Sequence, residues 1–158
     1  MDIENSKLSE NGFPSDKYIL EQYAEKAIEA GLINKPGILL YAETCELIIS
    51  LSPIKAGKLV QAAAKYHLYG EVTDFKGDKL LHLGFANIMR NADRDTVSYA
   101  ETSLRNKYKA TGKFSAGQDG KRRKNRPPFH QWFLDLLKRG DKIDFEEAQS
   151  SIDDMEVF

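Results

Sequence analysis

Apolar residues recur every three or four positions through most of this sequence, which is the period that keeps one face of a helix away from water. The pattern is longest between Lys79 and Lys109, where no proline interrupts it. No segment shows the sustained alternation of apolar and polar residues that a strand requires. The sequence therefore predicts an all-α fold: a compact helical core, a long helix that extends into a basic loop, a short docking helix and an acidic tail.

Local signals predict where several helices begin and end. Pro14-Ser15-Asp16 is typical of a helix start. The run from Ile38 to Leu51 favours a second helix of roughly 14 residues. Ser52 followed by Pro53 predicts an N-cap with proline in the first helical position. The helix that begins there is expected to end at Gly70.

These signals divide the chain into five segments. We expect a flexible arm at 1–14, a helical core domain at 15–110, a basic flexible loop at 111–128, a docking helix at 129–140 and an acidic tail at 141–158. Apolar positions become sparse after Asn91. The second half of the longest helix is therefore expected to leave the core and to be solvated on most sides.

The length of 158 residues, with 41% hydrophobic and 30% charged residues, suits one domain that buries a core without a metal or a disulfide. The first residues lack the basic and apolar regions of a signal peptide, and no apolar run is long enough to span a bilayer. We therefore expect a soluble intracellular protein with no membrane partner. The single cysteine, Cys45, lies in an apolar stretch and is expected to be a buried small hydrophobe.

Charge is segregated along the chain, although the net charge is only −1. Residues 1–103 carry a net charge of −4, residues 104–140 carry +9, and residues 141–158 carry −6. Like charges that gather in one segment repel one another unless solvent or a partner takes them up. The segregation therefore indicates that the basic segment is an interaction surface.

Catalytic motifs are not recognisable in the sequence. His67, His82 and His130 fall in separate predicted helices, and none has a second metal ligand at a usual spacing. The sequence contains no glycine-rich phosphate loop and no Gly-x-Ser-x-Gly elbow. We therefore expect a non-enzymatic protein that uses no metal and no cofactor.

The basic segment predicts contact with nucleic acid. Clusters of Lys and Arg on a mobile loop neutralise phosphates and release counterions without demanding a defined geometry. An exposed aromatic ring among them, such as Trp132, could stack on an unpaired base. The alternative is that Trp132 and Phe133 anchor the last helix to the core and that the loop is a solvated basic patch. The predicted nucleic-acid-binding residues are Arg105, Lys107, Lys109, Lys113, Lys121, Arg122, Arg123, Lys124, Arg126 and Trp132.

The last eight residues are acidic, contain apolar residues at intervals and end on Phe158. They resemble the C-terminal tip of bacterial and phage single-stranded DNA-binding proteins, in which aspartates precede a terminal phenylalanine. The resemblance implies that the ring of Phe158 docks in an apolar pocket of a partner protein while a basic residue there binds the carboxylate. The alternative is a solubilising acidic end that folds back on the basic loop. The predicted partner-docking residues are Asp153, Asp154, Val157 and Phe158.

A second resemblance covers residues 37–109. An apolar-aromatic segment that begins at Gly37, a break at Leu51-Ser-Pro53 and a helix that ends in Tyr69-Gly-Glu71 are followed by Arg94-Asp95 and Tyr99. This order is similar to an uncharacterised helical family of phages and prophages. The resemblance implies a place among phage replication genes and a location in the cytoplasm of a bacterial host cell.

Two functional hypotheses follow. The first is a non-enzymatic nucleic-acid-binding accessory protein of phage or mobile-element DNA metabolism, with an acidic C-terminal tail that docks on a partner protein. The second is a small adaptor or inhibitor that binds a host protein through its charged surfaces and does not bind nucleic acid. Affinity for arbitrary oligonucleotides with a steep salt dependence would favour the first hypothesis.

Overall fold

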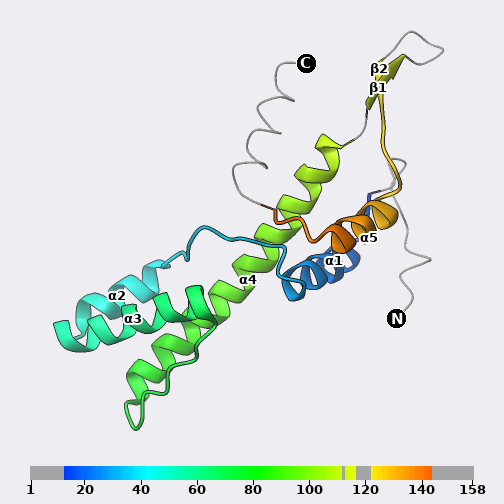
Figure 1. Cartoon of the computed structure of the whole chain (residues 1–158). Coiled ribbons are helices and arrows are strands. Elements are labelled where there is room, and N and C mark those ends of the chain that lie inside the picture. The colour runs from blue at the N-terminus through cyan, green and yellow to red at the C-terminus, as the bar shows by residue number, and fades with distance from the viewer. Residues whose placement is uncertain (1–12, 112, 117–121, 144–158) are drawn as a thin grey trace. The chain divides into compact units, whose positions relative to one another are not determined.

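The computed structural model describes residues 13–111, 113–116 and 122–143. The described residues form five helices and one pair of short strands (Figure 1). In chain order these are α1 (Lys17–Glu29), α2 (Ala42–Ser50), α3 (Pro53–Tyr69), α4 (Lys79–Ala110), β1 (Lys113–Ala116), β2 (Arg122–Asn125) and α5 (Phe129–Arg139). The prediction of an all-α fold is confirmed, because helices build both cores. The antiparallel β1–β2 pair lies in the segment that the sequence analysis took for a loop without regular structure.

Several helix ends follow the predicted signals. The Asp16 side chain accepts a hydrogen bond from the backbone N–H of Tyr18 and caps α1. Ser52 caps α3 in the same way, by accepting from the N–H of Lys55, and Pro53 occupies the first turn. α3 ends at Gly70, whose φ of 65° lies in the left-handed region that favours glycine.

The helix α2 begins later than the sequence predicted. Its first residue is Ala42 instead of Ile38, and Tyr41 precedes it in an extended conformation without a side-chain cap. The Tyr41 hydroxyl instead donates to the carboxylate of Asp95 at 2.8 Å. Asp95 is far along the chain, so the local sequence pattern could not show this contact.

The described chain divides into two compact units. The first, here called the central unit, is residues 36–96 and contains α2, α3 and the first part of α4. Its buried core is made of Leu59, Ala62, Ala63, Leu81, Phe85 and Ile88. Gly84 allows α2 to pack closely on α4, because a Cβ atom there would lie 2.5 Å from Cδ2 of Leu47.

The second unit, here called the terminal unit, comprises the described residues of 13–35 and 97–143. It contains α1, the rest of α4, the strands and α5. A backbone hydrogen bond of 2.7 Å from Ile143 to Leu32 joins the segments that follow α5 and α1. Its core is rich in aromatic residues and is made of Tyr23, Ala24, Ala27, Leu32, Ala100, Leu104, Tyr108, Phe129, Trp132, Phe133, Leu136 and Ile143.

Three expectations about burial are corrected by this arrangement. The second half of α4 is not solvated on most sides, because Ala100, Leu104 and Tyr108 are at most 1% exposed beneath residues from α1 and α5. The buried residues thus form two clusters, where the sequence predicted a single core over 15–110. Cys45 is exposed rather than buried, because the buried residue of α2 is its neighbour Thr44.

Candidate nucleic-acid interface

The predicted nucleic-acid-binding residues fall on four parts of the terminal unit. Arg105, Lys107 and Lys109 lie on the last turns of α4, Lys113 begins β1, and Trp132 lies on α5. Three consecutive basic residues, 122–124, form most of β2, and Arg126 follows that strand. Lys121 lies outside the described residues, as do the predicted docking residues Asp153, Asp154, Val157 and Phe158.

The two strands form a short antiparallel ribbon, in which Lys113 pairs with Asn125 and Ala116 pairs with Arg122. Together with the end of α4, this ribbon is here called the basic arm, residues 104–126. It contains nine Lys or Arg residues and one acid, Asp119. An isolated two-stranded ribbon is only marginally stable in water. The basic arm therefore depends on contacts at its base.

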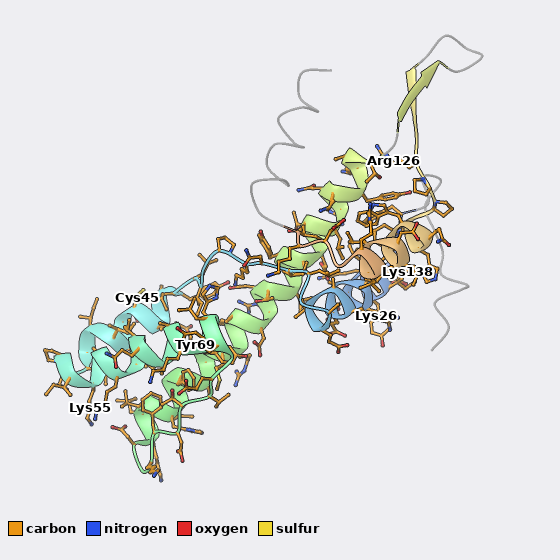
Figure 2. The ribbon with its side chains drawn as sticks, in the orientation of Figure 1. Lys26, Cys45, Lys55, Tyr69, Arg126 and Lys138 are labelled. Carbon is orange, nitrogen blue, oxygen red and sulfur yellow. The ribbon has the colours of Figure 1, made fainter. Side chains whose placement is uncertain are left out.

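Tyr108 supplies these contacts, because it touches the chain both before and after the ribbon. Before the ribbon, the Thr111 hydroxyl donates to the backbone carbonyl of Tyr108 at 2.6 Å. After the ribbon, the phenol of Tyr108 donates to the carbonyl of Pro127 at 2.7 Å. Figure 2 labels Arg126 near the C-terminal end of α4. Its guanidinium carbon lies 5.6 Å from the centre of the Tyr108 ring, within cation–π range. Tyr108 thus contacts the chain on both sides of the ribbon, through its backbone carbonyl before the ribbon and through its side chain after it.

The chemistry of Tyr108 suits this role. The residue is 1% exposed, and burial raises the pKa of its phenol above the usual value, although the charge of Arg126 acts in the opposite direction. The hydroxyl therefore stays protonated at neutral pH and can donate to Pro127. The Nε atom of Arg126 is buried and has no hydrogen-bond partner within the described part of the chain.

The three basic residues of α4 do not share one face. Arg105 and Lys109 are four residues apart and lie on the same side of the helix, whereas Lys107 lies on another side. The guanidinium carbon of Arg105 is 5.6 Å from the centre of the Phe13 ring. Arg105 therefore also takes part in packing, in addition to carrying charge.

The structure corrects the role expected of Trp132. Its side chain is only 4% exposed, and its ring centre lies 5.3 Å from that of Tyr108 and 5.4 Å from that of Phe129. A ring enclosed in this way offers no face to an unpaired base. The alternative interpretation, in which Trp132 and Phe133 anchor the last helix to the core, describes the observed packing.

The role of Tyr108 as the anchor of the basic arm was not predicted from the sequence. A weak signal was present: Tyr108 continues the helical apolar spacing up to the last residues before the glycine-rich segment. The proline pair 127–128 then fixes where the chain leaves the ribbon and starts α5. Together, Tyr108 and the proline pair mark where the chain enters and leaves the β1–β2 ribbon.

His130 contacts the aromatic core of the terminal unit. Nδ1 of His130 lies 2.7 Å from the hydroxyl of Tyr23, a pairing inside the aromatic core. In the described ranges, no group of three His, Cys, Asp or Glu side chains lies close enough to hold a metal ion. No helix within those ranges is both long and apolar enough to cross a membrane.

Comparison with protein-family models gives a match over more than half of the chain. The model of a family of unknown function (DUF6291) matches residues 37–124. That range takes in the whole helical part of the central unit and the basic arm as far as Lys124, and it leaves out α1 and α5. Neither the comparison with curated proteins nor the comparison with solved structures found a match.

Proposed function

The chain belongs to the family of unknown function DUF6291, and because this membership assigns no activity, we propose from its own residues that it is a non-enzymatic nucleic-acid-binding protein. The basic arm contacts the phosphates of the nucleic acid. The observation that carries the proposal is the tethering of this arm: seven basic residues and one acid lie in 109–126, and Tyr108 makes hydrogen bonds with Thr111 near the start of that stretch and with Pro127 just after its end.

Tethering favours phosphate binding for a physical reason. Like charges in one short segment repel one another, so the segment gains free energy when an anionic strand takes up that charge. Holding the ends of the segment lowers the entropy that the arm loses when it binds. Phosphate contacts alone do not specify sequence, so we expect similar affinities for unrelated oligonucleotides.

The wider setting that we propose is phage or mobile-element DNA metabolism in the cytoplasm of a bacterial host. Its support is the resemblance of residues 37–109 to a helical family of phages and prophages. The acidic end, with Asp153, Asp154, Val157 and Phe158, adds a docking site for a partner protein in this proposal. Support for that site comes from the sequence of the tip, because these residues lie outside the described part of the chain.

Fluorescence anisotropy with labelled single- and double-stranded oligonucleotides tests the main proposal. The variant R122S/R123S/K124S removes the three charges of β2, and K26S/K138S/R139S removes three charges from exposed positions of α1 and α5 as a matched control. The slope of log affinity against log salt should fall by about 0.7–0.9 for every phosphate that the variant no longer binds. We expect the β2 variant to bind weakly with a flatter slope and the control to bind nearly normally. Equal reductions of affinity in both variants would contradict a role for the arm.

The tail is tested separately with a host protein that recognises tips of single-stranded DNA-binding proteins. Burial of a phenylalanine ring and a charge-assisted contact to its carboxylate are each worth roughly 1.5–3 kcal/mol. Deletion of Phe158 should therefore weaken that binding about a hundredfold or more, while Ser150→Ala should leave it unchanged. A tail that instead folds back on the arm would give stronger oligonucleotide binding after the deletion.

A second candidate function is an adaptor or inhibitor that binds a host protein. The observation that favours it is the distribution of exposed large apolar side chains, which among the described residues lie in the central unit except for Tyr18 and Leu134. The most exposed are Ile49, Tyr69 and Ile54, at 83%, 76% and 74%. Exposed apolar surface of this kind is typical of protein-binding faces. Tight binding to one protein together with no affinity for oligonucleotides would favour this candidate.

A further inference from the structure

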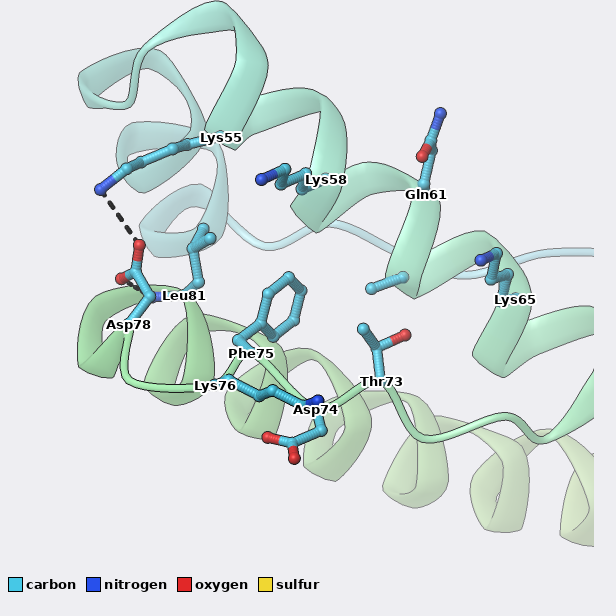
Figure 3. A pocket seen from close by; sticks show the side chains of 11 residues that line it. Lys55, Lys58, Gln61, Lys65, Thr73, Asp74, Phe75, Lys76, Asp78 and Leu81 are labelled. Atoms are coloured by element: carbon cyan, nitrogen blue, oxygen red, sulfur yellow. Dashed lines mark hydrogen bonds and ion pairs between the residues drawn. The ribbon is translucent and has the colours of Figure 1, made fainter.

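A cavity of about 510 Å³ opens in the central unit, well away in sequence from the basic arm. Figure 3 shows α3 on one side of it, carrying Lys58 and Lys65, and the loop before α4 on the other, carrying Thr73 and Phe75. The volume falls in the range of pockets that take small molecules, which is about 300–1,000 Å³. The pocket is thus large enough for a small molecule.

The charge of the lining is positive. Four of the lining residues are lysines and two are aspartates. Lys55 is already engaged, because its amine lies 3.0 Å from the Asp78 carboxylate, as the dashed line in Figure 3 shows. The hydrogen bond from Lys55 lowers the pKa of Asp78, so that pair stays ionised and neutral as a whole. Lys58, Lys65 and Lys76 remain against a single acid, Asp74.

The helix α3 presents two of these lysines at a useful spacing. Lys58 and Lys65 are seven residues apart, which is two helical turns, so both lie on one face of α3 about 10 Å apart along its axis. Lys76 lies across the cavity on the loop. Lysine acts as a mobile point charge toward phosphates. Charges spread over this distance suit a ligand with several anionic groups better than a single small ion.

The loop adds a hydrogen-bond donor and an apolar wall. The hydroxyl of Thr73 is buried and has no hydrogen-bond partner among the described residues, and an unpaired buried polar atom is costly. Phe75 is half-buried, and its ring packs edge-on against Phe85 with centres 5.7 Å apart. The pocket therefore combines cationic groups and a free hydroxyl with the ring of Phe75.

We propose that this pocket binds a phosphorylated small molecule of the nucleotide class. Its phosphates lie against Lys58, Lys65 and Lys76 and accept a hydrogen bond from the Thr73 hydroxyl. Its base lies against Phe75. This site is independent of the basic arm, since none of its residues belongs to 104–126.

Titration calorimetry with ATP, inorganic pyrophosphate, adenosine and a single-stranded oligonucleotide tests the proposal. The variant K58Q/K65Q removes two lining charges, and K79Q/R90Q removes two exposed charges of the same unit that do not line this cavity. All four sites are exposed helical positions where glutamine is well tolerated, so both variants should unfold like the unchanged chain, as circular dichroism would show. Thr73→Val provides a third variant that removes the hydroxyl alone.

We expect ATP to bind, with at least a tenfold loss of affinity in K58Q/K65Q, a smaller loss in Thr73→Val and less than a twofold change in K79Q/R90Q. Pyrophosphate and adenosine should each bind more weakly than ATP. No ATP binding by the unchanged chain, or equal losses in the two double variants, would overturn the proposal. Pyrophosphate that binds as tightly as ATP would overturn the nucleoside part. If the unchanged chain does not bind ATP and K58Q/K65Q binds the oligonucleotide more weakly, the two lysines belong to a nucleic-acid-binding surface instead.

Discussion

The two units of this chain bury their apolar residues to different extents. The terminal unit packs six aromatic rings in contact with one another, from Phe13 to Phe133, and leaves few large apolar side chains exposed. The central unit has a smaller core, and each of its helices exposes at least one large apolar side chain. The terminal unit buries most of its large apolar side chains in its own core, so it can carry a charged segment such as the basic arm. The central unit leaves large apolar side chains exposed, and such a surface is suited to binding a partner protein.

The aromatic core of the terminal unit should be the most sensitive part of the molecule. Phe129 is fully buried and its ring packs on Phe13, Tyr23, Tyr108 and Trp132. Phe129→Ala should therefore cost about 3–5 kcal/mol of unfolding free energy. The chain has one tryptophan, and it lies in this unit, so its fluorescence during urea unfolding reports on the terminal unit.

The matched change in the central unit is Phe85→Ala, since Phe85 is 1% exposed. It should lower the unfolding midpoint followed by circular dichroism while shifting the tryptophan midpoint less than Phe129→Ala does. Equal shifts of the tryptophan midpoint in both variants would mean that the two cores unfold as one.

The second prediction compares the two halves of α4. Leu81 lies in the central core at 3% exposure and Leu104 lies in the terminal core at 0%. Each change to alanine should cost about 2–5 kcal/mol, and the two costs should be similar. Thermal unfolding followed by circular dichroism measures both. A clearly smaller cost at Leu104 would restore the sequence-based expectation that this half of the helix is solvated.

That expectation failed for an identifiable reason. In the second half of α4 the buried face is made of small or widely spaced residues, such as Ala100 and Leu104, so the pattern is sparse. The residues that cover this face belong to α1 and α5, which lie more than 60 residues before and about 30 residues after them in the sequence. Periodicity reports the face of a helix and not the distant segment that packs on it.

Other features were predictable because they are local. Asp16, Ser52-Pro53, Gly70 and Gly140 each mark a helix end through hydrogen bonds or backbone angles within a few residues. The apolar face of α5 was also visible from its spacing. The β1–β2 ribbon was not, because β2 (Arg-Arg-Lys-Asn) has no apolar residue and the alternation in β1 (Lys-Phe-Ser-Ala) covers only four residues. At the candidate site, the basic residues were visible in the sequence, whereas the buried position of Trp132 depends on packing.

A third prediction uses two glycines that lie within helices of the central unit. A Cβ atom at Gly84 would lie 2.5 Å from Leu47, whereas one at Gly57 would meet nothing within 4 Å. Gly57→Ala should stabilise the chain by about 0.5–1 kcal/mol through helix propensity. Gly84→Ala should be less stable than Gly57→Ala by about 1–3 kcal/mol, because the new methyl group is overpacked. Chemical unfolding of both variants gives the difference, and equal stabilities would mean that the end of the Leu47 side chain moves aside at little cost.

The smallest effect should be a pH dependence of the central unit. Burial and a hydrogen bond to Asp93 raise the pKa of Tyr66 to about 12, from an unfolded value near 10. The folded state therefore holds this proton more tightly, so its contribution to stability is present below pH 10 and is lost as the pH rises to about 12. Tyr66→Phe should make the stability flatter over that range in thermal unfolding. An unchanged pH profile in Tyr66→Phe would contradict the raised pKa of the Tyr66 phenol.

The comparison of the two units leads to one direct test of nucleic-acid binding, which is amide chemical-shift mapping on the ¹⁵N-labelled chain. A single-stranded oligonucleotide of mixed sequence is added in steps at low salt. The basic arm predicts that the shifting amides belong to residues 104–116 and 122–126, and that the amides of α2 and α3 keep their positions. Shifts that concentrate on α2 and α3, or no shifts at oligonucleotide concentrations in large excess, would contradict the assignment of nucleic-acid binding to this arm.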